Sequence, residues 1–284
     1  MPLHWGGRFW NKDVYPYSFA EYLNARDIIL SKNWMYGKQA AEVSKAFNDY
    51  FLYGGFPELT DVIAKRVWLN DIYSKIFFSD LIVRNKVRNE EALGLLVRRL
   101  AENVKQPVSY TRLANLISSI GIKISKATVI EFIRYLKESC LIFPIENYAA
   151  KFAERNSNMK HYFIDNGLLS IFLLDGNTSL LENIVAIHLY KRYGAQLYFY
   201  NQNIEVDFII PEAKTAIQVS YSLMDETTCR REVEGLIKLN RVFPMDNMCI
   251  ITRDEERIIT HESGVSIHVI PVWKWLLEEE PLRT

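Results

Sequence analysis

The segment 204–221, IEVDFIIPEAKTAIQVSY, constrains the fold of this chain more than any other, because it has the pattern of a β-hairpin. Apolar and polar residues alternate in 204–210, which is the period of a half-buried strand. A turn-forming stretch follows at 211–214, and a second strand-like run occupies 216–221. The sequence therefore predicts two antiparallel strands joined by a tight turn.

Four polar side chains of this hairpin fall on shared strand faces. Residues two apart on a strand point the same way, so Glu205 lies beside Asp207, and Gln218 lies beside Ser220. Polar groups are thus gathered on a surface whose other residues are suited to burial.

This arrangement resembles the metal-binding core of the restriction-endonuclease-like, or PD-(D/E)xK, fold. The resemblance implies that carboxylates hold Mg²⁺ near a scissile phosphate while a lysine orients the attacking water. Asp207 matches the first acidic position, and Glu182, on the helix before the hairpin, matches an additional acid. Gln218 and Ser220 stand where the second acid and the lysine are expected. Glu182, Asp207, Gln218 and Ser220 are therefore the candidate catalytic residues, and the first three are the candidate metal ligands.

Two functions follow from this incomplete set. In the first, the chain is a non-catalytic binding module, because Gln218 removes a charge that Mg²⁺ prefers. In the alternative, the chain is a magnesium-dependent nuclease in which the carbonyl oxygen of Gln218 binds the ion. The negative charge and the assisting lysine would then come from other residues, namely Glu182, Glu205, Asp207, and Lys214 or Lys191.

Length and composition narrow the remaining possibilities. The 284 residues have room for two or three domains, and 34 basic residues balance 34 acidic ones, so DNA binding would depend on local patches. The sequence has no run of 18 apolar residues and no signal-peptide pattern at its start, which predicts a cytoplasmic protein without membrane contact. The five histidines and three cysteines have no zinc-ligand spacing.

The segment 91–165 has the rhythm of a winged helix-turn-helix. Ser109 and Ser125 stand where N-caps are expected, each directly before a helical pattern. The pattern predicts three helices and two wing strands, at 91–103, 110–119, 126–139, 140–148 and 160–164.

The third of these helices has the place of a recognition helix, but its charge is nearly balanced. Lysines and arginines exceed acids there by one, whereas a DNA reader usually concentrates positive charge. Both DNA binding and protein contact therefore stay open. If the module binds nucleic acid, the contacts are expected from Arg112, Asn115, Lys123, Lys126, Thr128 and Arg134.

Several strings resemble a bacterial and archaeal family of AAA-type ATPases that carries a C-terminal domain of unknown function. They are YPYSFAEYL at 15–23, YGGFPE at 53–58, YFIDNGL at 162–168, LLEN at 180–183, and EVDFI with IQVS in the hairpin. The resemblance implies the C-terminal part of such a protein. The P-loop that would hold ATP is missing from this sequence, so ATP hydrolysis would need a partner P-loop subunit or a longer chain.

The resemblance and the residue patterns together predict a multidomain protein of the α+β or α/β class. Residues 1–90 are expected to form a helical segment like the end of an AAA domain and its lid. Residues 91–165 are expected to form the winged helix-turn-helix, and residues 166–284 the restriction-endonuclease-like α/β domain.

Overall fold

A mixed β-sheet runs through most of the chain. The computed structural model describes residues 14–35, 37–151, 155 and 157–277. Within them the strands are β1 Val108–Ser109, β2 Ile142–Asn147, β3 Asn158–Phe163, β4 Tyr198–Asn201, β5 Glu205–Ile210, β6 Thr215–Val219, β7 Asn247–Thr252, β8 Arg257–Thr260 and β9 Ser266–Pro271.

These nine strands form one sheet in the order β1-β3-β2-β4-β5-β6-β7-β9-β8. The strands β1, β3 and β2 are antiparallel neighbours, and β4, β5 and β6 form an antiparallel meander. Parallel pairs join β2 to β4, β6 to β7, and β7 to β9, while β8 returns antiparallel at one edge. The sheet therefore continues across residue 165, where the sequence predicts a domain boundary.

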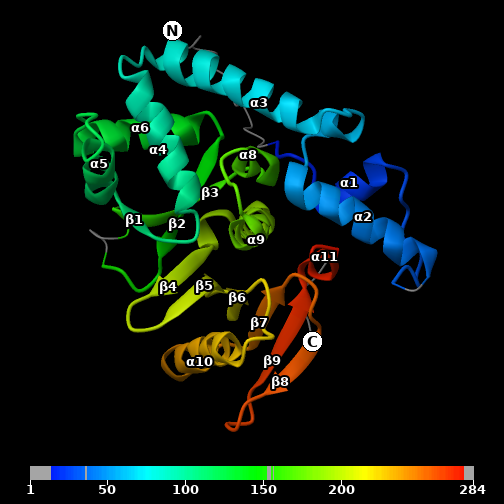
Figure 1. The fold of residues 1–284 in the computed structure, drawn as a ribbon. Helices are drawn as coiled ribbons and strands as arrows, with labels where there is room; N and C mark the ends of the chain where they lie inside the picture. The colour runs from blue at the N-terminus through cyan, green and yellow to red at the C-terminus, as the bar shows by residue number, and fades with distance from the viewer. Residues whose placement is uncertain (1–13, 36, 152–154, 156, 278–284) are drawn as a thin grey trace, which may run out of the picture.

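Helices surround this sheet (Figure 1). The ten α-helices of the described residues are α1 Phe19–Ala25, α2 Lys38–Tyr53, α3 Lys65–Lys75, α4 Glu90–Glu102, α5 Tyr110–Ser118, α6 Lys126–Glu138, α8 Asn166–Ser170, α9 Asn177–Tyr193, α10 Glu226–Val242 and α11 Val272–Trp275. Three other helical segments are the 3₁₀ turns η1 Pro57–Thr60 and η3 Gly194–Gln196, and the π-helix η2 Ile76–Val83.

The sheet separates two hydrophobic cores. The side chains of Ala216 and Ile217 are neighbours on β6 but belong to different cores, because successive side chains point to opposite faces. The smaller core lies under α10, and the larger one contains α9 and the helices of the N-terminal half. No described helix combines the length and the apolar character needed to cross a bilayer.

The structure confirms the local predictions and corrects several boundaries. The side-chain oxygens of Ser109 and Ser125 accept hydrogen bonds from backbone N–H groups of the helices that follow, as N-caps do. The predicted hairpin is present as β5 and β6, although β6 ends at Val219 because the chain then leaves the ladder. The sequence did not predict the short strands β1 and β8 or the change to π-helical winding after Lys75.

Candidate functional site

Asp207 owes its position to an irregularity in β5. The pairing of β4 with β5 shifts between Tyr198 and Tyr200, which leaves an extra residue on β5. Such bulges redirect side chains, and they are common beside functional sites. The Oδ2 atom of Asp207 accepts a hydrogen bond of 3.0 Å from the backbone N–H of Val219. The carboxylate thus takes the place of a ladder bond where β5 and β6 separate.

The Gln218 side chain forms hydrogen bonds with backbone groups of β5 beside this irregularity. Its Oε1 atom accepts a hydrogen bond of 2.9 Å from the backbone N–H of Asp207. Its Nε2 atom donates one of 3.1 Å to the carbonyl oxygen of Glu205. Gly235 of α10 lies so close that an added Cβ atom would stand 3.0 Å from Nε2. The amide oxygen proposed from sequence as a metal ligand is therefore already used as a hydrogen-bond acceptor.

A lysine that the sequence analysis did not identify stands between two of the candidate acids. The Nζ atom of Lys160, on β3, lies 3.1 Å from Glu182 Oε1 and 3.0 Å from Asp207 Oδ1. The Lys160 side chain is 0% exposed. The hydroxyl of Tyr162, two residues along β3, donates a 2.7 Å hydrogen bond to the same oxygen of Glu182. Three elements distant in sequence, β3, α9 and β5, thus meet in one buried ion cluster.

The two lysines suggested from sequence lie elsewhere. Lys191 Nζ donates a 2.5 Å hydrogen bond to the carbonyl oxygen of Pro16. Lys214 lies 3.4 Å from Asp246 in an exposed ion pair at the hairpin turn. The strand pattern around Lys160 was the available signal, since a lysine and a tyrosine two apart share one face of β3.

Burial and charge together set the protonation of this cluster. Burial raises the pKa of Glu182, the ammonium of Lys160 opposes this rise, Asp207 adds to it, and the resulting pKa is about 7. Burial alone would lower the pKa of Lys160, but the two carboxylates outweigh it and raise that pKa above its usual value. Lys160 therefore stays charged, and Glu182 exchanges its proton near neutral pH.

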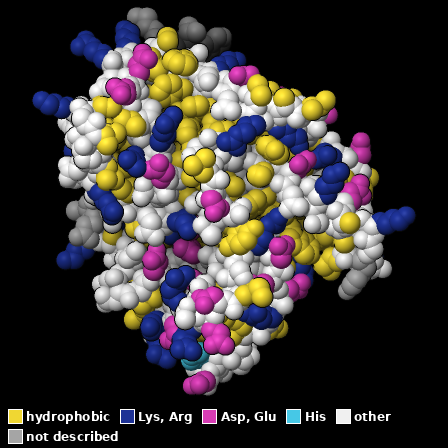
Figure 2. Space-filling view, viewed as in Figure 1, with side chains coloured by type: hydrophobic (Ala, Val, Ile, Leu, Met, Phe, Trp, Pro, Cys, Tyr) yellow, Lys and Arg dark blue, Asp and Glu magenta, His cyan; other side chains and the backbone are white. Residues whose placement is uncertain are grey.

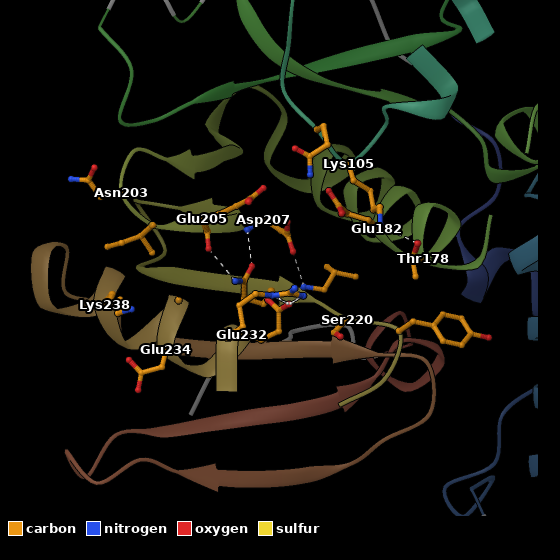
Figure 3. Close-up of a pocket in the computed structure, with 17 residues that line it drawn as sticks. Lys105, Thr178, Glu182, Asn203, Glu205, Asp207, Ser220, Glu232, Glu234 and Lys238 are labelled. Carbon is orange, nitrogen blue, oxygen red and sulfur yellow. Dashed lines mark hydrogen bonds and ion pairs between the residues drawn. The ribbon is translucent and has the colours of Figure 1, made fainter. Parts of the chain in front are cut away.

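The candidate catalytic residues line a single cavity of about 540 Å³ (Figure 3). Glu182, Asp207, Gln218 and Ser220 all reach it, and the Oγ atom of Ser220 donates to the carbonyl oxygen of Ser222. The structure therefore brings the four predicted residues together, and it adds residues of α10 and of the loop after α4. The further charged residues are Lys105, Glu205, Arg231, Glu232, Glu234 and Lys238.

Two of these added residues illustrate how the walls are built. Lys105 donates a 3.0 Å hydrogen bond to the hydroxyl of Thr178 at the start of α9. Glu232 is buried on α10, where its Oε1 atom accepts from Arg231 Nη2 at 2.6 Å, and burial raises the pKa of Glu232. The cavity is therefore lined from both sides of the predicted boundary at residue 165.

The residues present do not fit Mg²⁺. An ammonium occupies the space between the Glu182 and Asp207 carboxylates, and the Gln218 oxygen faces a backbone N–H. Among the residues that the structure describes, no group of three or more His, Cys, Asp or Glu side chains is arranged to hold a metal ion. Magnesium prefers near-octahedral oxygen ligands, which this set cannot offer while Lys160 stays in place.

The candidate nucleic-acid contacts lie on a separate surface formed by α5 and α6. Arg112, Asn115, Lys123 and Lys126 are exposed there, and within the described chain none of the three cations is seen in an ion pair. Thr128 is partly exposed, with its hydroxyl 2.9 Å from that of the N-cap serine.

Arg134 differs from the other cations of this surface. Its guanidinium lies 3.9 Å from Glu131 and 4.0 Å from Glu138 on the same helix. These acids offset its charge, whereas Lys126, at the N-terminal end of α6, has no ion pair among the described residues.

Several of the family-like strings meet in a second buried polar cluster. The Asp165 carboxylate accepts hydrogen bonds from the N–H groups of Gly55 and Gly167, at 2.7 and 2.8 Å. Asn166 donates to the carbonyl oxygen of Phe51, and it accepts from Asn183. The strings at 53–58, 162–168 and 180–183 therefore have a structural role here, which is to join α2 to α8 and α9.

Gly7 and Arg8, which precede the first family-like string, lie outside the described residues. Within that string, the backbone N–H of Tyr17 donates to the carbonyl oxygen of Gly55 at 2.7 Å. The string at 15–23 therefore also contributes to this junction.

The chain is similar to proteins from an archaeon and a bacterium. A family described as "Domain of unknown function (DUF8612)" matches residues 44–179. An uncharacterized protein of Methanocaldococcus jannaschii is 30% identical over 285 residues, which cover 95% of this chain and 64% of the relative. An uncharacterized protein of Haemophilus influenzae is 28% identical over 281 residues, which cover 96% of this chain and 66% of the relative.

No solved structure matches the chain. The chain spans just under two thirds of the length of both relatives, so about a third of each relative lies outside the match.

Proposed function

We propose that this chain is a non-catalytic nucleic-acid-binding module with a nuclease-like cavity, and that it corresponds to the C-terminal part of an AAA-type ATPase family protein. The order α9, β4, β5, β6, α10, β7 supports a restriction-endonuclease-like unit. The order α4, α5, α6, β2, β3 supports a winged helix-turn-helix before it. The additional third of each relative supports the existence of longer proteins that contain this region.

One observation carries the non-catalytic assignment. The ammonium of Lys160 stands 3.1 Å from Glu182 and 3.0 Å from Asp207, so a resident cation already neutralises the acids that would bind metal. Displacing it would leave an ammonium buried without a counter-charge, which costs several kcal/mol. A divalent ion that binds a carboxylate pair without a resident lysine does not have to overcome this cost.

The nucleic-acid assignment depends on the α5–α6 surface. Arg112, Lys123 and Lys126 are exposed and have no ion pair within the described chain. Lys126 begins α6, whose N-terminus adds partial positive charge. Such a surface suits phosphate groups as ligands. The cavity does not, because its several carboxylates would repel them.

A single experiment with two measurements tests this proposal. We expect a fluorescent DNA duplex to bind the chain without being cut in Mg²⁺ or Mn²⁺, and the affinity to fall steeply as salt rises. Lys123→Glu with Lys126→Glu should weaken binding by about tenfold or more, because two favourable phosphate contacts become repulsive. Lys38→Glu with Lys45→Glu, an equal charge reversal of two exposed lysines on α2, is the matched control and should leave binding unchanged.

Other results would overturn one part or the other. Metal-dependent cutting that is lost in Asp207→Ala would establish the nuclease alternative. A weak affinity with little salt dependence, unaffected by the double charge reversal, would exclude DNA binding at this surface and indicate a protein partner.

A further inference from the structure

The outer side of the continuous helix formed by α3 and η2 exposes large apolar side chains. Val67, Phe78 and Val83 are 60%, 55% and 72% exposed, and Ile63, just before the helix, is 101% exposed. The helix α3 lies along an outer edge of the molecule in Figure 1, and hydrophobic side chains gather along the same edge in Figure 2. Four large apolar side chains exposed along one helical element are more than the scattered single residues that need no explanation.

The π-helical winding of η2 creates part of this surface. In a π-helix the hydrogen bonds join residues five apart, so Phe78 and Val83 lie on the same side. Leu81 and Ile82, which regular α-helical spacing would place near Phe78, are buried instead. The wider turn therefore keeps one pair of apolar residues in the core and another pair outside.

We propose that this face binds the same face of a second copy of the chain, with the two helices antiparallel. An antiparallel alignment about a two-fold axis near Tyr73 sets Val67 opposite Phe78 of the second copy. The same alignment sets Ile63 opposite Val83 of the second copy. Each apolar contact thereby occurs twice by symmetry, as an isologous interface requires.

Charged residues beside these exposed apolar side chains favour the antiparallel orientation. Asp71 and Lys75 are both exposed on one flank of α3, and neither is seen in an ion pair within the described chain. In the antiparallel alignment Asp71 of each copy lies opposite Lys75 of the other, which forms two symmetric pairs. A parallel alignment would set like charges against each other, and like-charge contacts disfavour association. The sequence of this face is therefore self-complementary in one direction only.

The size of the face indicates a reversible dimer. The helix from α3 through η2 is about 30 Å long. A single helix pair of that length buries less surface than a permanent dimer, so the association is expected to depend on protein concentration.

Sedimentation velocity over a range of protein concentrations tests the interface. We expect the unaltered chain to shift from monomer to dimer as its concentration rises. Phe78→Glu should raise the dimer dissociation constant by at least tenfold, because it places a charge against the apolar Val67 side chain of the second copy. Ile258→Glu, at an apolar residue on β8 that is 64% exposed, is the matched control and should leave the dimer unchanged.

A charge exchange separates this interface from any other dimer. Asp71→Lys alone should weaken the dimer, since it sets two lysines opposite each other, and Lys75→Asp alone should weaken it equally. The double variant Asp71→Lys with Lys75→Asp restores opposite charges and should recover the original affinity. A chain that is monomeric at every concentration, or a double variant no better than the single ones, would overturn the proposal.

Discussion

Lys160 shows how one side chain can set the charge balance of a buried site. Its ammonium lies between the carboxylates of Glu182 and Asp207 and forms an ion pair with each. A buried ion pair contributes little when complete, because desolvation offsets much of the attraction, but removing one partner leaves an uncompensated charge. The stability of this region therefore depends on Lys160 more than on either acid alone.

Replacing this lysine tests that dependence. Lys160→Met should lower the free energy of unfolding by about 3–5 kcal/mol, because two carboxylates would be left without their cation. Lys214→Met removes an exposed partner of Asp246 and should change the free energy by less than about 1 kcal/mol. Urea unfolding followed by circular dichroism measures both. Small and equal decreases in the free energy of unfolding would mean that the buried cluster contributes no more to stability than the exposed ion pair.

At the scale of elements, the junction between α2 and α8 depends on close backbone contact. Gly54 ends α2 with φ +79° and ψ −163°, a conformation that side chains disfavour. A Cβ atom added there would lie 1.9 Å from the Asp165 carboxylate. The glycine is therefore required twice, once for its backbone angles and once for the space.

Gly37 provides a control for the first of these requirements. It has φ +81° and ψ −148°, but an added Cβ atom would meet nothing within 4 Å. Gly37→Ala should therefore cost about 1–3 kcal/mol from backbone strain alone. Gly54→Ala should cost several kcal/mol more because it also displaces Asp165, and thermal unfolding compares the two. If both variants lose the same stability, the junction is not closely packed.

The elements that could be predicted from sequence are those encoded locally. The serine-capped helices and the β5–β6 hairpin have their signals within a few residues of each other, so capping chemistry and alternation were sufficient. β1 has two residues and β8 is an exposed edge strand, so neither has a usable period. The π-helical turn in η2 depends on which apolar residues the core accepts, and this is a tertiary effect.

The site could be predicted only in part for the same reason. Asp207 and Gln218 were found because they belong to one hairpin, and Glu182 was found through a resemblance. Lys160 reaches them from β3, 22 residues before Glu182. The bulge that turns Asp207 toward this lysine leaves no pattern in the sequence.

For the whole molecule, buried acids and buried histidines have opposite effects on stability as the pH changes. Burial raises the pKa of Asp165 to about 6 and that of Glu182 to about 7, so between pH 4 and 7 the folded chain keeps protons that the unfolded chain loses. Burial lowers the pKa of His161 and of His188 to about 4, so above pH 4 the unfolded chain keeps protons on these histidines that the folded chain has lost. The acids make stability fall as pH rises, and the histidines make it rise.

Removing one acid should expose the opposite trend. In Asp165→Asn, stability should rise with pH more steeply than in the unaltered chain between about pH 4 and 6, by up to about 1.4 kcal/mol per pH unit. Urea unfolding at a series of pH values gives the two slopes. Equal slopes for the two proteins would mean that burial leaves the protonation of Asp165 unchanged.

The continuous sheet has a consequence for dissecting this protein into fragments. β2 and β4 are joined by backbone hydrogen bonds, and Asn147 on β2 also bonds the backbone of Asn201 on β4. A truncation at residue 165 would separate β2 from β4 and leave two strand edges without hydrogen-bond partners, which promotes aggregation. Deletion mapping would then report insoluble halves rather than separable activities, so point substitutions are the sounder route to assigning roles.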